Sequence, residues 1–131
     1  MTRTRVPAVA TPTSTLRLVQ AAAVLSVLVL LWQFFTAGRM ISGTDALSGH
    51  GAGAIALHVS TALLLATTAL HGRRTGQWWP AALTGVTFLL TFLQAWLGSS
   101  GQIAAHVPVA LVVTIGIVWV TAWAFWPTDN V

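Results

Sequence analysis

Four histidines, His50, His58, His71 and His106, are the side chains in this 131-residue chain best suited to bind a metal or cofactor. The chain has no cysteine, which excludes a disulfide, an iron–sulfur cluster, a thiolate zinc site and covalently attached haem. Its two carboxylates make a catalytic carboxylate pair or a carboxylate proton relay very improbable. We assign no catalytic residue, and the sequence does not favour an enzyme.

The elements that position these histidines are membrane helices. Hydrophobic residues make up 56% of the chain and charged residues 6%, whereas a soluble domain has about a quarter of its residues charged. Four uncharged runs approach the roughly 20 residues that cross a bilayer core, at about 18–37, 51–70, 78–97 and 103–126. The sequence therefore predicts an all-α, four-helix transmembrane bundle over residues 16–127. Residues 1–15 are expected to be a disordered cytoplasmic tail.

The arginines predict the orientation of the bundle, because cytoplasmic loops collect positive charge. Five of the six arginines fall on one side of a four-span chain and only Arg39 falls on the other. Both termini are therefore expected in the cytoplasm of a multi-pass cell-membrane protein. The net charge of +4 rests on few groups and does not indicate a nucleic-acid partner.

A helix pair recurs in the sequence. Gln33 lies near the end of the first run and His50 opens the second span, while Gln94 lies near the end of the third run and His106 lies near the start of the fourth. The two pairs would be parallel repeats, so His50 and His106 should lie at one depth near the extracytoplasmic face. Inward-facing histidines at one level can bind a flat cofactor from both faces, which is the geometry of bis-histidine haem.

The residues near these histidines leave room for such a cofactor. Ala54 and Ala110 each follow a histidine by four residues and so share its helix face. Gly53 would let the backbone approach a porphyrin closely. The alternative is that the two histidines form hydrogen bonds within the bundle or lie at the interface, with His50 in the outer loop.

This pattern resembles one four-helix half of the haem A synthase family, over roughly Val19 to Ala124. The matching segments are residues 50–53 for the first histidine, and residues 97–98 through 105–107 for the second. The resemblance implies a haem b held between His50 and His106, for electron transfer or haem handling. The chain is also similar to short four-span membrane proteins of actinobacteria, and its basic residues, all arginine, favour a bacterial source.

The chain departs from the haem A synthase pattern at the catalytic positions. Leu47 stands where that family has a glutamate, and Gly51 stands where it has an arginine. The cysteine pair of many family members is also absent. The resemblance therefore implies the cofactor-holding fold and not the hydroxylation of haem.

Other polar residues have two interpretations each. Arg39 is expected either to pair with a haem propionate or to form an ion pair with Asp45. Gln33 and Gln94 either bond across the bundle or lie at the cofactor edge. For His58 we favour a structural hydrogen bond over a second haem or a proton shuttle, and we expect His71 to be solvated.

Two other functions remain open at this point. The chain could be a cofactor-free accessory subunit of a larger membrane complex, or a small transporter of a neutral solute. A single unit of a normally duplicated fold is also expected to pair with itself as a homodimer. Besides the lipid bilayer, a quinone is a possible redox partner.

Overall fold

The computed structural model describes residues 14–126 and has four helices in this part of the chain: α1 (Ser14–Ile41), α2 (Leu47–Thr75), α3 (Trp79–Ser99) and α4 (Ile103–Phe125). The prediction of an all-α four-helix bundle is confirmed. Each helix is long and apolar enough to cross a bilayer, so the chain is a multi-pass membrane protein. Most of the predicted disordered tail, residues 1–13, lies outside the described residues, but Ser14 and Thr15 already belong to α1.

Short turns join the helices, and their residues explain where the helices end. Gly76 closes α2 in the left-handed conformation, with φ of 80°, and its N–H donates to the Gly72 carbonyl at 2.8 Å. Pro80 lies in the first turn of α3, where no helical donor is lost. Gly43 and Gly101 also have positive φ in the other two turns. These turns are too short for anything but antiparallel neighbours.

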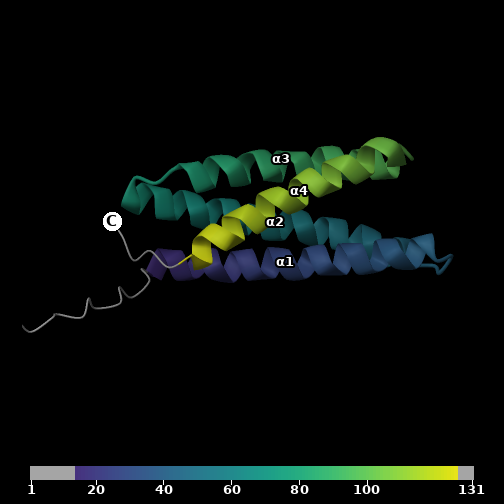
Figure 1. The fold of residues 1–131 in the computed structure, drawn as a ribbon, viewed down its shortest axis with the longest axis horizontal. Coiled ribbons are helices and arrows are strands. Elements are labelled where there is room, and N and C mark those ends of the chain that lie inside the picture. The colour runs from purple at the N-terminus through teal and green to yellow at the C-terminus, as the bar shows by residue number, and fades with distance from the viewer. Residues whose placement is uncertain (1–13, 127–131) are drawn as a thin grey trace, which may run out of the picture.

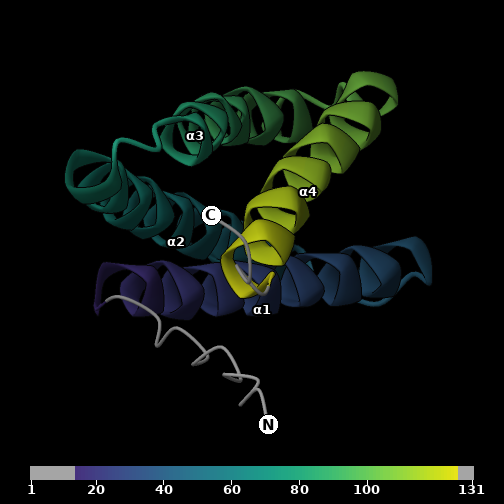
Figure 2. The same ribbon diagram turned by 60° about the vertical axis from the view of Figure 1, so that its left-hand side comes forward.

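Each helix packs against its sequence neighbours, and α4 closes the bundle against α1 (Figure 1). The parallel helices α2 and α4 are therefore diagonal. Figures 1 and 2 show α4 leaving the end of α3 and crossing toward the start of α1. We call the end with Arg17, Arg73 and Arg74 the basic end, and the end with His50 and His106 the histidine end.

The interior is built from small and hydroxylated side chains. At the basic end a core cluster joins α1, α2 and α4, formed by Val19, Ala22, Ala23, Leu64, Val120 and Ala124. Buried threonines such as Thr61, Thr68 and Thr84 donate to the carbonyl four residues earlier, at 2.6–2.8 Å. Because each hydroxyl is bonded within its own helix, these polar residues can lie inside a membrane bundle without an unpaired group.

Candidate functional site

His50 and His106 meet at the histidine end, across the diagonal of the bundle. Their ring centroids lie 6.3 Å apart, with the ring planes tilted by 58°. Both side chains are half-buried. The two histidines belong to the first turns of α2 and α4, which run in the same direction, so the topology brings them to one level.

The His50 ring is oriented by Thr36 of α1. Thr36 Oγ1 lies 3.0 Å from His50 Nδ1 and also 3.0 Å from the carbonyl oxygens of Trp32 and Gln33. Because the threonine hydroxyl donates its one proton to a carbonyl, its oxygen accepts from a protonated Nδ1. We therefore assign the proton of His50 to Nδ1, which leaves the lone pair on Nε2.

The His106 ring is held by the end of α3. His106 Nδ1 donates to the Gln94 carbonyl at 2.8 Å, and the Gln94 side-chain amide lies 3.2 Å from Nε2. A protonated Nδ1 and a donating amide again place the lone pair on Nε2. Gly98 makes room for the ring, because a Cβ there would lie 2.8 Å from His106 Cε1 and 2.9 Å from Nδ1.

A cavity of about 350 Å³ lies beside the two imidazoles, mostly between α1 and α4. Five of the predicted site residues line it, namely His50, His106, Gln33, Gln94 and Ala110. The rest of the lining is almost wholly apolar and includes Leu30, Phe34, Leu57, Leu111 and Val113. The cavity volume is within the range of about 300–1,000 Å³ that is usual for small-molecule sites.

Gln33 lines the cavity but bonds to the backbone of α2. With its nitrogen 3.0 Å from the His50 carbonyl and its oxygen 3.1 Å from the Ala54 N–H, the amide satisfies both groups. A Cβ on Gly53 would lie 2.6 Å from the end of the Gln33 side-chain amide and 2.7 Å from Trp32 Cδ1. Gly53 and Ala54 are thus at the contact with α1 and are not part of the cavity lining, contrary to our expectation for a porphyrin-facing surface.

Arg39 lies away from the cavity. Phe34, Ala37 and Ile41 line the cavity from one face of α1. Phe35 and Arg39, four residues apart, share a different face, and the Arg39 guanidinium carbon lies 6.0 Å from the centroid of the Phe35 ring. The structure therefore does not place Arg39 where it would meet a group bound between the histidines.

His58 and His71 lie outside the cavity lining. His58 Nδ1 bonds to the Ala54 carbonyl at 2.6 Å, which is the structural hydrogen bond we favoured, and its ring meets Phe92 edge-on. The expectation of a solvated His71 is wrong. His71 is 6% exposed, lies 3.1 Å from Thr15 Oγ1 through Nδ1, and packs against Trp123, because α1 begins early enough to cover it.

The sequence interpretation missed Thr36 and Gly98, which orient and accommodate the two rings. Thr36 follows Gln33 by three residues, but Leu97 occupies the equivalent position after Gln94, so the internal repeat gave no indication of it. Gly98 looked like a helix terminator at the end of a span, whereas it belongs to α3 and faces His106.

Comparison with known proteins gives no match to a family model, a curated protein or a solved structure. The case for a function therefore rests on the geometry of the two histidines and their surroundings.

Proposed function

We propose that the chain binds one haem b between His50 and His106, near the extracytoplasmic face, for electron transfer or haem handling. The separation of the two rings, 6.3 Å between centroids, carries the proposal. Imidazoles on opposite sides of one metal ion, each with a metal–nitrogen bond of about 2 Å, have ring centres about 6 Å apart. The resemblance of the sequence to one four-helix half of the haem A synthase family is part of the same proposal.

The hydrogen bonds at the site support ligation through Nε2 of both rings. Each Nδ1 bonds to a fixed oxygen, Thr36 Oγ1 at 3.0 Å or the Gln94 carbonyl at 2.8 Å. Such partners are typical of metal-binding histidines, because they fix the ring orientation and raise the basicity of the ligating nitrogen. The apolar side chains of the cavity would keep water from the metal and so influence its reduction potential.

Haem bound here would supply a one-electron redox couple. His50 and His106 would hold the iron of this group through Nε2, and the chemistry supplied here would then be electron transfer rather than oxygen binding. Arg39 is not part of the proposed site, because it lies on a different face of α1.

Gln94 has two opposite effects on His106. Its carbonyl orients the ring through Nδ1, whereas its amide occupies the lone pair of Nε2 at 3.2 Å. Iron would have to displace this amide. His50 Nε2 has no such competitor among the hydrogen bonds of residues 14–126, so we expect His50 to be the stronger ligand.

The test is absorption spectroscopy of the purified full-length chain in detergent after titration with haemin. We expect one haem per chain, with a Soret band and split visible bands on reduction. His50→Ala and His106→Ala should each remove the six-coordinate spectrum, while His58→Ala and His71→Ala should keep it. A wild-type chain that retains no haem, or equal losses in all four variants, would contradict the proposal.

A further inference from the structure

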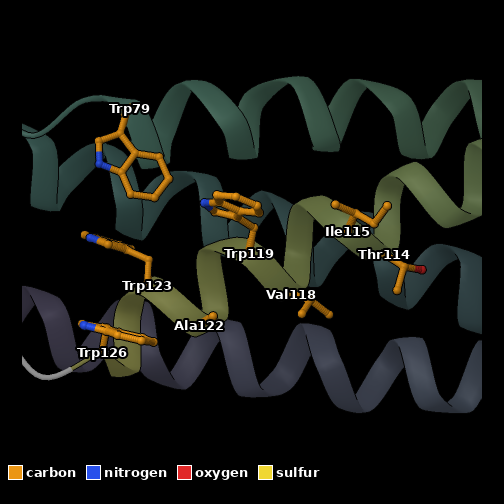
Figure 3. A pocket seen from close by; sticks show the side chains of 8 residues that line it. All are labelled: Trp79, Thr114, Ile115, Val118, Trp119, Ala122, Trp123 and Trp126. Atoms are coloured by element: carbon orange, nitrogen blue, oxygen red, sulfur yellow. The ribbon is translucent and has the colours of Figure 1, made fainter.

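A second hollow lies on the outer surface of α4 and runs from the middle of this helix to the basic end. It has a volume of about 680 Å³ and is lined by one residue of α3, Trp79, and by α4 from Thr114 to Trp126. Four of the lining residues are tryptophans: Trp79, Trp119, Trp123 and Trp126 (Figure 3). We call this hollow the tryptophan groove.

The four indoles share the direction of their ring nitrogens, although their ring planes differ (Figure 3). Figure 3 shows the ring nitrogen of each turned toward the basic end, while the rest of the groove continues along α4 toward Thr114. Trp123 packs edge-on against Trp79, with ring centroids 5.3 Å apart. This contact stabilises the end of the groove nearest the basic end, which we call its mouth. An indole N–H is only a donor, so the mouth offers donors to an acceptor at the membrane surface.

The charge at the basic end has the matching sign. Arg73 and Arg74 are exposed in the last turn of α2 and are separated from Trp79 by one short turn. Asp45, the one carboxylate within residues 14–126, lies at the opposite end, between α1 and α2. Exposed guanidinium groups at the same end of the bundle as the indole donors favour an anion with several acceptor oxygens there.

The length of the groove matches one lipid chain. The twelve residue steps from Thr114 to Trp126 cover about 18 Å at a helical rise of about 1.5 Å each. The hydrocarbon depth of one leaflet is about 15 Å, half of a core of about 30 Å. The apolar part of the groove therefore has the depth of one acyl chain that starts at the membrane surface.

We propose that the tryptophan groove binds one anionic phospholipid. Its acyl chain lies along α4 between Ile115 and Trp123, and its phosphate accepts hydrogen bonds from the indole groups. Arg73 and Arg74 select a headgroup with net negative charge over a zwitterionic one, by about thirtyfold for two arginines at a membrane surface. The groove shares Thr114 with the cavity beside the two histidines, but its indole groups and the two arginines lie at the basic end, so the lipid proposal does not depend on the haem proposal.

The first experiment tests headgroup selection. Native mass spectrometry of the full-length chain, released from detergent with equal amounts of phosphatidylglycerol and phosphatidylcholine of the same acyl chains, should show about thirtyfold more bound phosphatidylglycerol. The double variant Arg73→Gln, Arg74→Gln should bind the two lipids equally. Arg39→Gln, a loss of positive charge at the other end, should keep the preference. Equal retention by the wild type, or equal effects of both charge changes, would overturn the proposal.

The second experiment tests the groove itself. Ala122→Phe places a ring in the groove without changing the charge, and should lower lipid retention several-fold for either headgroup. Val112→Phe adds the same ring to an exposed position of α4 outside the groove, and should retain lipid as the wild type does. Circular dichroism checks that both variants fold. Lipid retention by Ala122→Phe equal to that of Val112→Phe would overturn the placement.

Discussion

The two ends of the bundle differ in how α1 meets α4. At the basic end, Ala23 and Ala124 let the helices approach, and the Gln20 amide donates to the Ala124 carbonyl at 2.9 Å. At the histidine end, Phe34 and Leu111 line a cavity of about 350 Å³ between the same two helices. Small residues at one end and bulky ones at the other thus set the crossing of α4, and the crossing creates the site.

The same threonine–histidine bond is used at both ends of the α1–α2 pair. Thr15 lies 3.1 Å from His71 Nδ1, and Thr36 lies 3.0 Å from His50 Nδ1. What differs between the two ends is the residue of α4 that contacts each histidine. His71 meets Trp123 in a closed core, whereas His50 meets His106 beside a cavity. The threonine–histidine bond therefore joins α1 to α2 at both ends. Only at the histidine end does α4 place a second histidine beside it, which is the arrangement that the proposed haem binding needs.

The largest effect on the proposed haem site is expected from Gly98→Ala, which would force the His106 ring from its place. A Cβ there would lie 2.8 Å from His106 Cε1. We expect haem affinity to fall by close to 100-fold, the upper range for disturbed ligand orientation. Haemin titration measures it. Gly85→Ala is the control, since its Cβ would meet only Leu65 at an ordinary 3.7 Å. Similar affinities of the two variants would show that His106 is not held as we infer.

The second prediction compares substitutions of the two threonines that bond to histidines. Thr36→Val removes the acceptor that orients His50 and should weaken haem binding about tenfold. Thr15→Val removes the matching bond to His71 and should leave haem binding unchanged, although it lowers the thermal stability. Affinity and melting temperature are measured on both variants. If Thr15→Val weakens haem binding as much as Thr36→Val, the separation between the two ends is wrong.

A smaller effect of opposite sign is expected from Gln94→Ala. The substitution removes the amide that competes for His106 Nε2 but keeps the carbonyl that orients Nδ1. Loss of one competing hydrogen bond, about 1 kcal/mol, should raise haem affinity about fivefold. Gln33→Ala is the control, because the Gln33 amide bonds to the backbone of α2 and not to a ring. A lower affinity in Gln94→Ala would mean that the amide supports the bound state.

The sequence was sufficient for the fold and for the meeting of the two histidines. Four apolar runs with charges between them predict the helices, and the antiparallel order puts the start of α2 and of α4 at one end. That His50 and His106 lie at one level then follows from their equal distance from the helix starts. The proposed ligation of haem remains a prediction.

The details that orient the rings could not be predicted, because they depend on helix rotation and crossing. Gly53 was assigned to the cofactor face, but the rotation of α2 turns it toward Trp32 and Gln33. His71 lies beside two arginines in the sequence, which suggested solvent, but the early start of α1 buries it under Thr15. Such outcomes depend on contacts between helices and not on local composition.

The smallest predicted effect concerns Trp32, which bonds to the backbone next to His50. Trp32 Nε1 donates to the Gly49 carbonyl at 3.0 Å, next to the histidine, but the bond is exposed at the membrane surface. Trp32→Phe keeps an aromatic ring near α2 but loses this bond and part of the indole, and the loss of the bond should lower the unfolding free energy by about 0.5 kcal/mol. The melting temperature in detergent should fall by about 1–2 °C, and haem affinity should change less than in Thr36→Val. A larger loss of haem affinity than in Thr36→Val would move the main support of His50 from its ring nitrogen to its backbone.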